Sequence, residues 1–288
     1  MKQIYLLKYV VLFLCNSILL QSQDLAQTLQ LANEQMDLGN YHGAIALYSR
    51  VSFFGDKSTK LDCSIAIGDC YFSMNDFSRS IQEYNKAIVS TNSDSLRNEL
   101  YIRKAYSYLS QNNFNLALDE IKKMEEGDKN EYYNRKLFHL GLIEFLMFSF
   151  QSSEKDLLAY TSQTCPDKSE QLKKIFKATS KIQKRKKSKL WLSSVIIPGS
   201  GQLLNSDYRN GVNSLLLNCS LFALTYYVGY QYGIPDAALT VFPWSYRYYS
   251  SGIKKSHLAA KDRVKELHGE VFNEIIELYT ECQEDESE

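Results

Sequence analysis

The segment whose residue types best suit ligand chemistry is the glycine-rich stretch at residues 198–202, PGSGQ. Polar residues follow it. Such loops can hold a phosphate when a strand leads into them and a helix N-terminus, usually with a lysine, follows. No strand pattern precedes this stretch and no lysine ends it. Pro198 can stop a helix, and Gly199 and Gly201 permit a turn or close packing. We therefore predict the bend of a membrane hairpin, and its water-exposed residues are expected to be Asn205, Asp207 and Arg209.

Cysteines and histidines form no pattern typical of catalysis or metal binding. Beyond Cys15, five irregularly spaced cysteines do not indicate a disulfide framework. Cys63 and Cys70 are too far apart along one helix for a disulfide, so they are predicted to be small buried residues. The histidines share no motif with a nucleophile or with carboxylate ligands, and they are His42, His139, His257 and His268. We expect no enzyme, no cofactor and no metal.

Charge is balanced overall but uneven along the chain. Among 288 residues, 33 lysines and arginines offset 33 acidic residues, so no global field favours nucleic acid. Basic residues gather at 181–189, and the C-terminus ends in an acidic tail. The opening residues carry Lys2 and Lys8 before a short apolar run, a pattern that predicts a secretory signal over residues 1–23. A secreted chain makes nucleic acid an unexpected partner.

Residues 24–165 contain four copies of one pattern. Each copy begins with a small residue and has an aromatic residue nine positions later, a small residue three further on and a large residue after that. The first small residues are spaced by 36, 37 and 36 positions, and they are Ala32, Gly68, Ala105 and Gly141. Small residues let paired helices approach closely, so the pattern predicts stacked helical hairpins.

This pattern resembles the tetratricopeptide repeat, a helical hairpin of 34 residues. Ile67-Gly68 and Tyr71 stand at the family's L-G-x-x-Y positions, although the family's tryptophan is missing throughout. The second helices match its A-x-x-x-F positions with the pairs Ala44 and Tyr48, Ser80 and Tyr84, Ala117 and Ile121, and Ser153 and Leu157. The resemblance implies a solenoid that binds a protein or peptide on its concave face.

By the same resemblance, the concave face is lined by first-helix residues and is aromatic and mildly acidic. The partner-binding residues that it implies are Asn33, Met36, Asp69, Phe72, Tyr106, Leu109, Phe138 and Leu142. Ordinary packing between repeats is the competing interpretation for each aromatic side chain. A carboxylate clamp like that of chaperone-binding members is not expected, because only Asn33 of its lysine and asparagine cluster is present.

A basic helix at residues 166–189 is predicted to cap the repeats and lead to a membrane surface. It precedes an apolar domain at 190–250, in which residues 211–235 carry no charge over a length that can span a bilayer. An amphipathic helix with an acidic tail is expected at 251–288. The apolar domain resembles small bacterial membrane domains with a P-G-x-G-Q motif, and the matching residues are Pro198, Gly199, Gly201, Gln202, Asn205, Tyr208 and Gly211.

The combined prediction is an all-α protein: a solenoid like that of tetratricopeptide repeats, followed by a membrane-associated helical hairpin and a C-terminal amphipathic helix. We expect a membrane-anchored scaffold of the bacterial envelope, with a protein or peptide ligand, lipid contacts and repeats in the periplasm. Basic residues on both flanks of the apolar domain conflict with that placement, since they favour the cytoplasm. The alternative is an accessory subunit of a transport or insertion complex.

Overall fold

The computed structural model describes residues 25–125 and 130–285, and every regular element there is a helix. The predicted signal sequence at 1–23 lies outside the described residues. The chain divides into two compact units, of which the first ends at Tyr160 and the second begins at Thr161.

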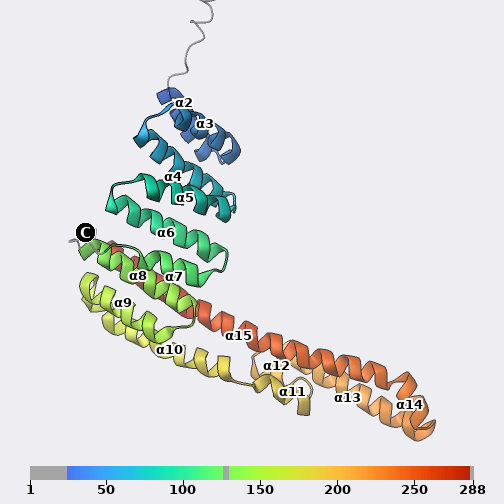
Figure 1. The fold of residues 1–288 in the computed structure, drawn as a ribbon. Helices are drawn as coiled ribbons and strands as arrows, with labels where there is room; N and C mark the ends of the chain where they lie inside the picture. Colours follow the sequence, from blue (N-terminus) through green and yellow to red (C-terminus); the bar gives the residue numbers. More distant parts are fainter. Residues whose placement is uncertain (1–24, 126–129, 286–288) are drawn as a thin grey trace, which may run out of the picture. The chain divides into compact units, whose positions relative to one another are not determined.

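The first unit is a stack of helical hairpins that follow one another in chain order (Figure 1). The helices are α2 (Leu25–Asp37), α3 (Tyr41–Phe54), α4 (Lys57–Ser73), α5 (Phe77–Ser90), α6 (Asp94–Ser110), α7 (Phe114–Lys122), α8 (Asn130–Leu146) and α9 (Phe150–Thr164). Each odd-numbered helix folds back on the helix before it. The predicted all-α solenoid of tetratricopeptide type is confirmed.

The repeated small residues close each hairpin. A methyl group on Gly68 would overlap the ring of Tyr84, and one on Gly141 would overlap Leu157. The second-helix pairs of the repeat are all fully or almost fully buried, at 0–2 % exposure: Ala44 and Tyr48, Ser80 and Tyr84, Ala117 and Ile121, Ser153 and Leu157. Buried apolar area and close helix contact therefore stabilise the hairpin at the positions where the repeat pattern predicts them.

The turns inside the hairpins share one geometry. In each, one residue has a positive φ, its N–H donates to the carbonyl three residues back, and the next N–H donates to the carbonyl five residues back. This is the Schellman arrangement, which satisfies the last carbonyls of a helix. The residues with positive φ are Gly39, Asn75, Asn112 and Phe148, and a fifth turn with the same bonds lies in the second unit at Ser206.

The second unit contains long helices joined by short ones. They are η1 (Pro166–Lys168), α10 (Ser169–Lys187), η2 (Leu190–Leu192), α11 (Ser193–Ile196), α12 (Ser200–Leu204), α13 (Tyr208–Gln231), α14 (Ile234–Thr240) and α15 (Phe242–Asp285). Figure 1 shows α13 and α15 side by side with α14 at their shared end. The predicted boundary at residue 250 lies inside α15, which is continuous through the apolar domain and the amphipathic segment.

One part of this unit has an ordinary apolar core. Here α10 packs along α15 and buries Leu172, Phe176 and Ile182. The apolar face expected of the amphipathic helix in α15 is made of Leu267, Val271, Ile275, Leu278 and Cys282, and all of these except the half-buried Leu267 are buried. A disulfide joins Cys165 to Cys282 across 117 positions. Sequence spacing did not indicate it.

Residues 190–256 are built the opposite way, and we call them the inverted segment. Their interior holds polar and small residues, including Ser194, Gln202, Asn218, Ser245 and Ser256, each at most 2 % exposed. Their surface is apolar and aromatic, with the largest exposures, from 77 % to 85 %, at Tyr226, Leu239, Tyr230, Ile234 and Ile196. Water-soluble proteins bury apolar residues preferentially, so this distribution of polar and apolar residues is the reverse of an ordinary core.

The bend of the hairpin lies at other residues than the sequence predicts. The two long helices are α13 and α15, and they turn through α14 rather than through residues 198–209. The apolar stretch at 190–205 folds into three short helical pieces instead of one leg of the hairpin. Pro198 and Gly199 break the chain there, which is why no long helix forms.

Candidate functional site

The first helices α2, α4, α6 and α8 carry the predicted partner-binding residues, and the structure divides these into three groups. Tyr106 is exposed at 42 %, and Phe72, Leu109, Leu142 and Met36 are half-buried. Asn33 and Asp69 already have hydrogen-bond partners within the chain. Phe138 is buried. The face therefore offers fewer aromatic contacts than the repeat pattern predicts.

Phe138 corrects that prediction directly. Only 6 % of its surface is exposed, and its ring centroid lies 5.4 Å from that of Tyr160 on α9. It lies three positions before Gly141, as the buried Ile102 lies three positions before Ala105, although the resemblance placed it among the ligand-facing residues of the first helices. Packing within the last hairpin uses it instead, which is the competing interpretation that the sequence left open.

Two tyrosines hold the polar residues of this face. The Tyr48 hydroxyl donates to Asn33 Oδ1 at 2.6 Å, and the Tyr84 hydroxyl donates to Asp69 Oδ1 at the same distance one repeat later. Burial raises the pKa of Tyr48 to about 12 and that of Tyr84 still further, with the hydrogen bond to Asp69 adding to the second shift. Both phenols therefore remain hydrogen-bond donors at neutral pH.

Ion pairs link successive first helices across the same face. Arg103 on α6 contacts Asp69 on α4 at 2.5 Å and Glu99 at 3.5 Å, and Glu99 contacts Arg135 on α8 at 2.7 Å. These charges alternate and compensate one another, so the mildly acidic lining expected from the sequence is largely neutralised. Each side chain is partly exposed, so we expect each pair to add at most about 1 kcal/mol to stability.

Tyr106 stands next to His139 of the following repeat. Their ring centroids are 5.8 Å apart in an edge-on arrangement, and the Tyr106 hydroxyl lies 3.4 Å from His139 Nδ1. Burial, helped by the charge of Arg135 and opposed by that of Glu99, lowers the pKa of His139 to about 4. A neutral imidazole and an exposed phenol give this part of the face a polar aromatic surface without net charge.

Replacing His139 with glutamine is expected to remove part of the acid sensitivity of folding. The folded-state pKa of about 4 is below the ordinary value of 6.5, so between these values only the unfolded chain gains the proton. His139 therefore costs stability as pH falls through this window, by up to about 1.4 kcal/mol per pH unit. Urea midpoints at pH 7 and pH 5 measure the effect. His42→Gln, at an exposed position of α3, is the control and should behave as the wild type does; equal pH dependence in all three chains would contradict the assignment.

The motif residues of the second unit are brought together, but as packing contacts. The Gln202 side chain is fully buried and donates to the Gly252 carbonyl on α15 at 3.1 Å, while Gly201 N–H donates to Ser194 Oγ at 2.8 Å. Asn205 Nδ2 donates to the Gly201 carbonyl, and its Oδ1 accepts from Arg185 of α10. These bonds join α10, α11, α12 and α15.

Glycines make this junction possible. Gly199 has φ +89°, and a methyl group there would overlap the Gly211 carbonyl oxygen. A methyl group on Gly201 would overlap Ser256, and one on Gly211 would press on Leu203. Pro198 precedes this turn, whereas Tyr208 begins α13 with its side chain exposed. The expected water exposure of Asn205 is wrong, since it is 6 % exposed, because its amide closes the turn.

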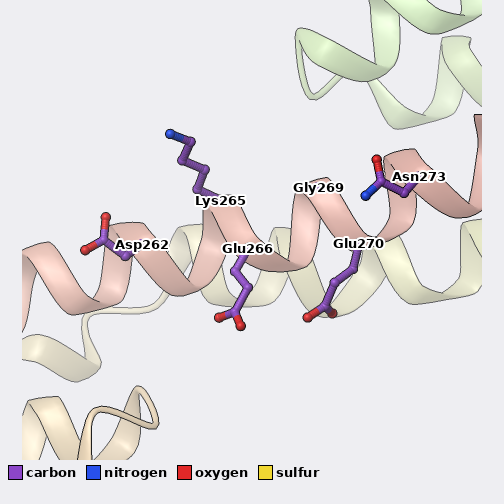
Figure 2. A pocket seen from close by; sticks show the side chains of 6 residues that line it. All are labelled: Asp262, Lys265, Glu266, Gly269, Glu270 and Asn273. Atoms are coloured by element: carbon purple, nitrogen blue, oxygen red, sulfur yellow. The ribbon is translucent and has the colours of Figure 1, made fainter.

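A shallow hollow of about 440 Å³ lies along α15 (Figure 2). All of its lining residues come from this one helix, and Glu266 and Glu270 point to one side while Lys265 points away from them. Arg263 contacts Glu266 at 2.7 Å and Glu270 at 4.0 Å. With one wall and internally paired acids, this surface does not enclose a ligand.

A stack of helical hairpins defines a class of proteins that present extended surfaces to other chains. Comparison with family models places a tetratricopeptide repeat at residues 62–88, which cover most of α4 and nearly all of α5. This match supports a tetratricopeptide repeat protein. A comparison with curated proteins found no match.

Proposed function

We propose that the protein is a membrane-anchored scaffold of the bacterial envelope. In this proposal the face formed by α2, α4, α6 and α8 binds a protein or peptide, and the inverted segment holds the chain in a lipid bilayer. Tetratricopeptide repeats generally serve protein interaction, and this supports the first half. The second half rests on the unusual distribution of polar and apolar residues in the second unit.

The inverted segment is the observation that carries the membrane proposal. Helix α13 has 24 residues, or about 36 Å at 1.5 Å per residue, which exceeds a hydrocarbon core of about 30 Å. Apolar helices of this length also form the cores of soluble proteins, but those helices are buried. Only 11 % of the most apolar window of α13 is buried, so its apolar side chains face outward.

The interior of the segment supports the same proposal. Without a hydrophobic driving force between helices in lipid, membrane helices associate through small residues and side-chain hydrogen bonds. Gly201, Gly211 and Gly252 provide the close contacts here, and Thr225 Oγ1 lies 3.1 Å from Ser245 Oγ between α13 and α15. Exposed tyrosines near α14 are suited to a headgroup region.

The disulfide supports a topology that the sequence left in conflict. Cys165 and Cys282 lie on either side of the inverted segment, so their bond requires both flanks to be in one compartment. Stable disulfides are typical of oxidising compartments outside the bacterial cytoplasm. We infer that the hairpin of α13 and α15 enters and leaves the bilayer on the same, external side, despite the basic residues at 181–189.

Fractionation of full-length and shortened chains tests the anchor. The full chain is expected to stay with membranes after an alkaline carbonate wash, whereas a chain that ends at Thr164 should be recovered in the soluble fraction. Circular dichroism should show that the shortened chain remains helical. A full chain that is soluble without detergent would refute the anchor. A shortened chain that stays in the membrane would locate the tether in the N-terminal residues.

Affinity capture tests the partner face in the same cells. Tyr106→Ala combined with Phe72→Ala should weaken recovery of co-purifying proteins, because aromatic contacts at an interface contribute about 2 kcal/mol or more each. Phe53→Ala is the matched control, since Phe53 is an aromatic residue of the second helix α3 and is 77 % exposed. If the Phe53 variant loses partners to the same extent, the binding face is elsewhere.

A further inference from the structure

A polar cleft opens between α13 and α15 within the inverted segment. Its volume is about 190 Å³, far above the roughly 10–15 Å³ that a single water molecule requires. The polar residues that line it include Asn210, Ser214, Asn218, Ser251 and Lys255. A cleft lined by polar residues is unexpected in a segment whose outer surface is apolar. Gln202, the buried glutamine of the motif, does not line it.

Asn218 lines the cleft and has an unused acceptor. Its Nδ2 donates to the Ser214 carbonyl at 2.7 Å, so the orientation of the amide is determined. Its Oδ1 is buried without a hydrogen-bond partner, although the residue is only 2 % exposed. Buried polar atoms nearly always have partners, and this requirement is stronger in a bilayer. Because less than 1 Å² of this atom is accessible, a donor from a bound molecule reaches it only when α13 and α15 move slightly apart at the cleft.

Lys255 gives the cleft its charge. Among the described lining residues it is the one that carries a formal charge, and its side chain is exposed at the mouth. The neighbouring Asn210 amide already donates to both carboxylate oxygens of Asp207 at 3.0 Å, which leaves that acid occupied. A ligand that contacts both residues needs an anionic group for Lys255 and an O–H or N–H group for Asn218.

We propose that this cleft binds the polar headgroup of a membrane phospholipid that carries a hydrogen-bond donor. The phosphate contacts Lys255, and a hydroxyl or ammonium group donates to Asn218 Oδ1. Phosphatidylethanolamine and phosphatidylglycerol have such donors, whereas phosphatidylcholine has the phosphate but no donor. The proposal rests on the membrane association proposed above and adds a preference among lipids.

Lipid retention by the full chain tests the proposal. The protein is exchanged into nanodiscs that contain phosphatidylcholine with an equal share of phosphatidylethanolamine, and lipids that stay bound after mild delipidation are measured by mass spectrometry. Phosphatidylethanolamine should be enriched about tenfold, the size expected for one charge-assisted hydrogen bond. Asn218→Leu should abolish the preference, and Lys255→Gln should lower retention of both lipids about tenfold.

Matched variants separate these effects from misfolding. Lys254→Gln removes the adjacent exposed charge, which does not line the cleft, and should retain lipid as the wild type does. Lys255→Arg keeps a cation and should restore retention. Equal lipid content and equal composition in the wild type, Asn218→Leu and Lys255→Gln would overturn the proposal and leave water as the occupant of the cleft.

A soluble probe keeps the two proposals distinguishable. If the full chain does not associate with membranes, the anchor fails, but the cleft can be titrated with sn-glycero-3-phosphoethanolamine and binding measured by isothermal titration calorimetry. Binding that Lys255→Gln weakens about tenfold would support the cleft alone. Absence of binding in that case would overturn both proposals.

Discussion

Replacing Cys165 and Cys282 together with serine is expected to lower the free energy of unfolding of the second unit by about 2–5 kcal/mol. The bond closes 117 positions of chain, and loops of that length lose the most entropy in the unfolded state when they are cross-linked. It also ties the end of α15 to the start of α10, next to the buried contacts of Ile275 and Leu278.

Tryptophan fluorescence during chemical unfolding in detergent measures this change in one unit alone, because both tryptophans, Trp191 and Trp244, belong to the second unit. Cys219→Ser is the control, since this cysteine is exposed and not bonded, and its unfolding midpoint should match that of the wild type. Reducing agent should lower the wild-type midpoint and leave the double serine variant unchanged. An unchanged midpoint in the double variant would show that the disulfide contributes little.

The second large effect is expected for Gly199→Ala, which should cost about 2–5 kcal/mol or prevent folding of the inverted segment. Two causes act together. The backbone of Gly199 has φ +89°, which an alanine adopts only with strain, and the added methyl group meets the Gly211 carbonyl oxygen, a backbone atom that cannot rotate away.

Gly269→Ala provides a control of opposite sign. Gly269 lies inside α15 with nothing within 4 Å of an added methyl group, so alanine should raise stability by about 0.5–1 kcal/mol through its helix propensity. The same fluorescence transition compares the two variants. A Gly199→Ala chain as stable as the wild type would show that the turn before α12 is not constrained by its glycine.

The repeats were predictable because their determinants are local and periodic. Gly68 and Tyr84 lie on the two helices of one hairpin, and their sizes must be complementary wherever that hairpin occurs. The same spacing applied to Ala105, Ala117 and Ile121, all of which are buried. Periodic position also distinguishes Phe138 from Tyr106, which the prediction treated alike because both lie on a first helix. Phe138 lies three positions before Gly141, as Ile102 lies three positions before Ala105, and both are buried. Tyr106 directly follows Ala105 and is exposed.

Other features depend on contacts between distant positions. The partner of Cys165 could not be identified from spacing, because Cys282 reaches it only when α15 returns alongside α10. The unused acceptor of Asn218 likewise arises only when α13 and α15 pack. One missed feature did carry a signal: Asp207, Tyr208 and Gly211 have the spacing of Asp76, Phe77 and Ser80, and the turns that precede both sets have the same Schellman bonds.

The disulfide also determines how a pulling force would pass through the chain. Residues 165–282 form a covalent ring that contains the whole inverted segment. A load applied through the hairpins enters this ring at Cys165 and divides between the backbone leading into α10 and the sulfur bridge leading into α15. Helices α13 and α15 are then loaded together from the same end. If α13 and α15 lie in a bilayer as proposed, a pulling force must therefore withdraw both helices together, rather than separate one from the other.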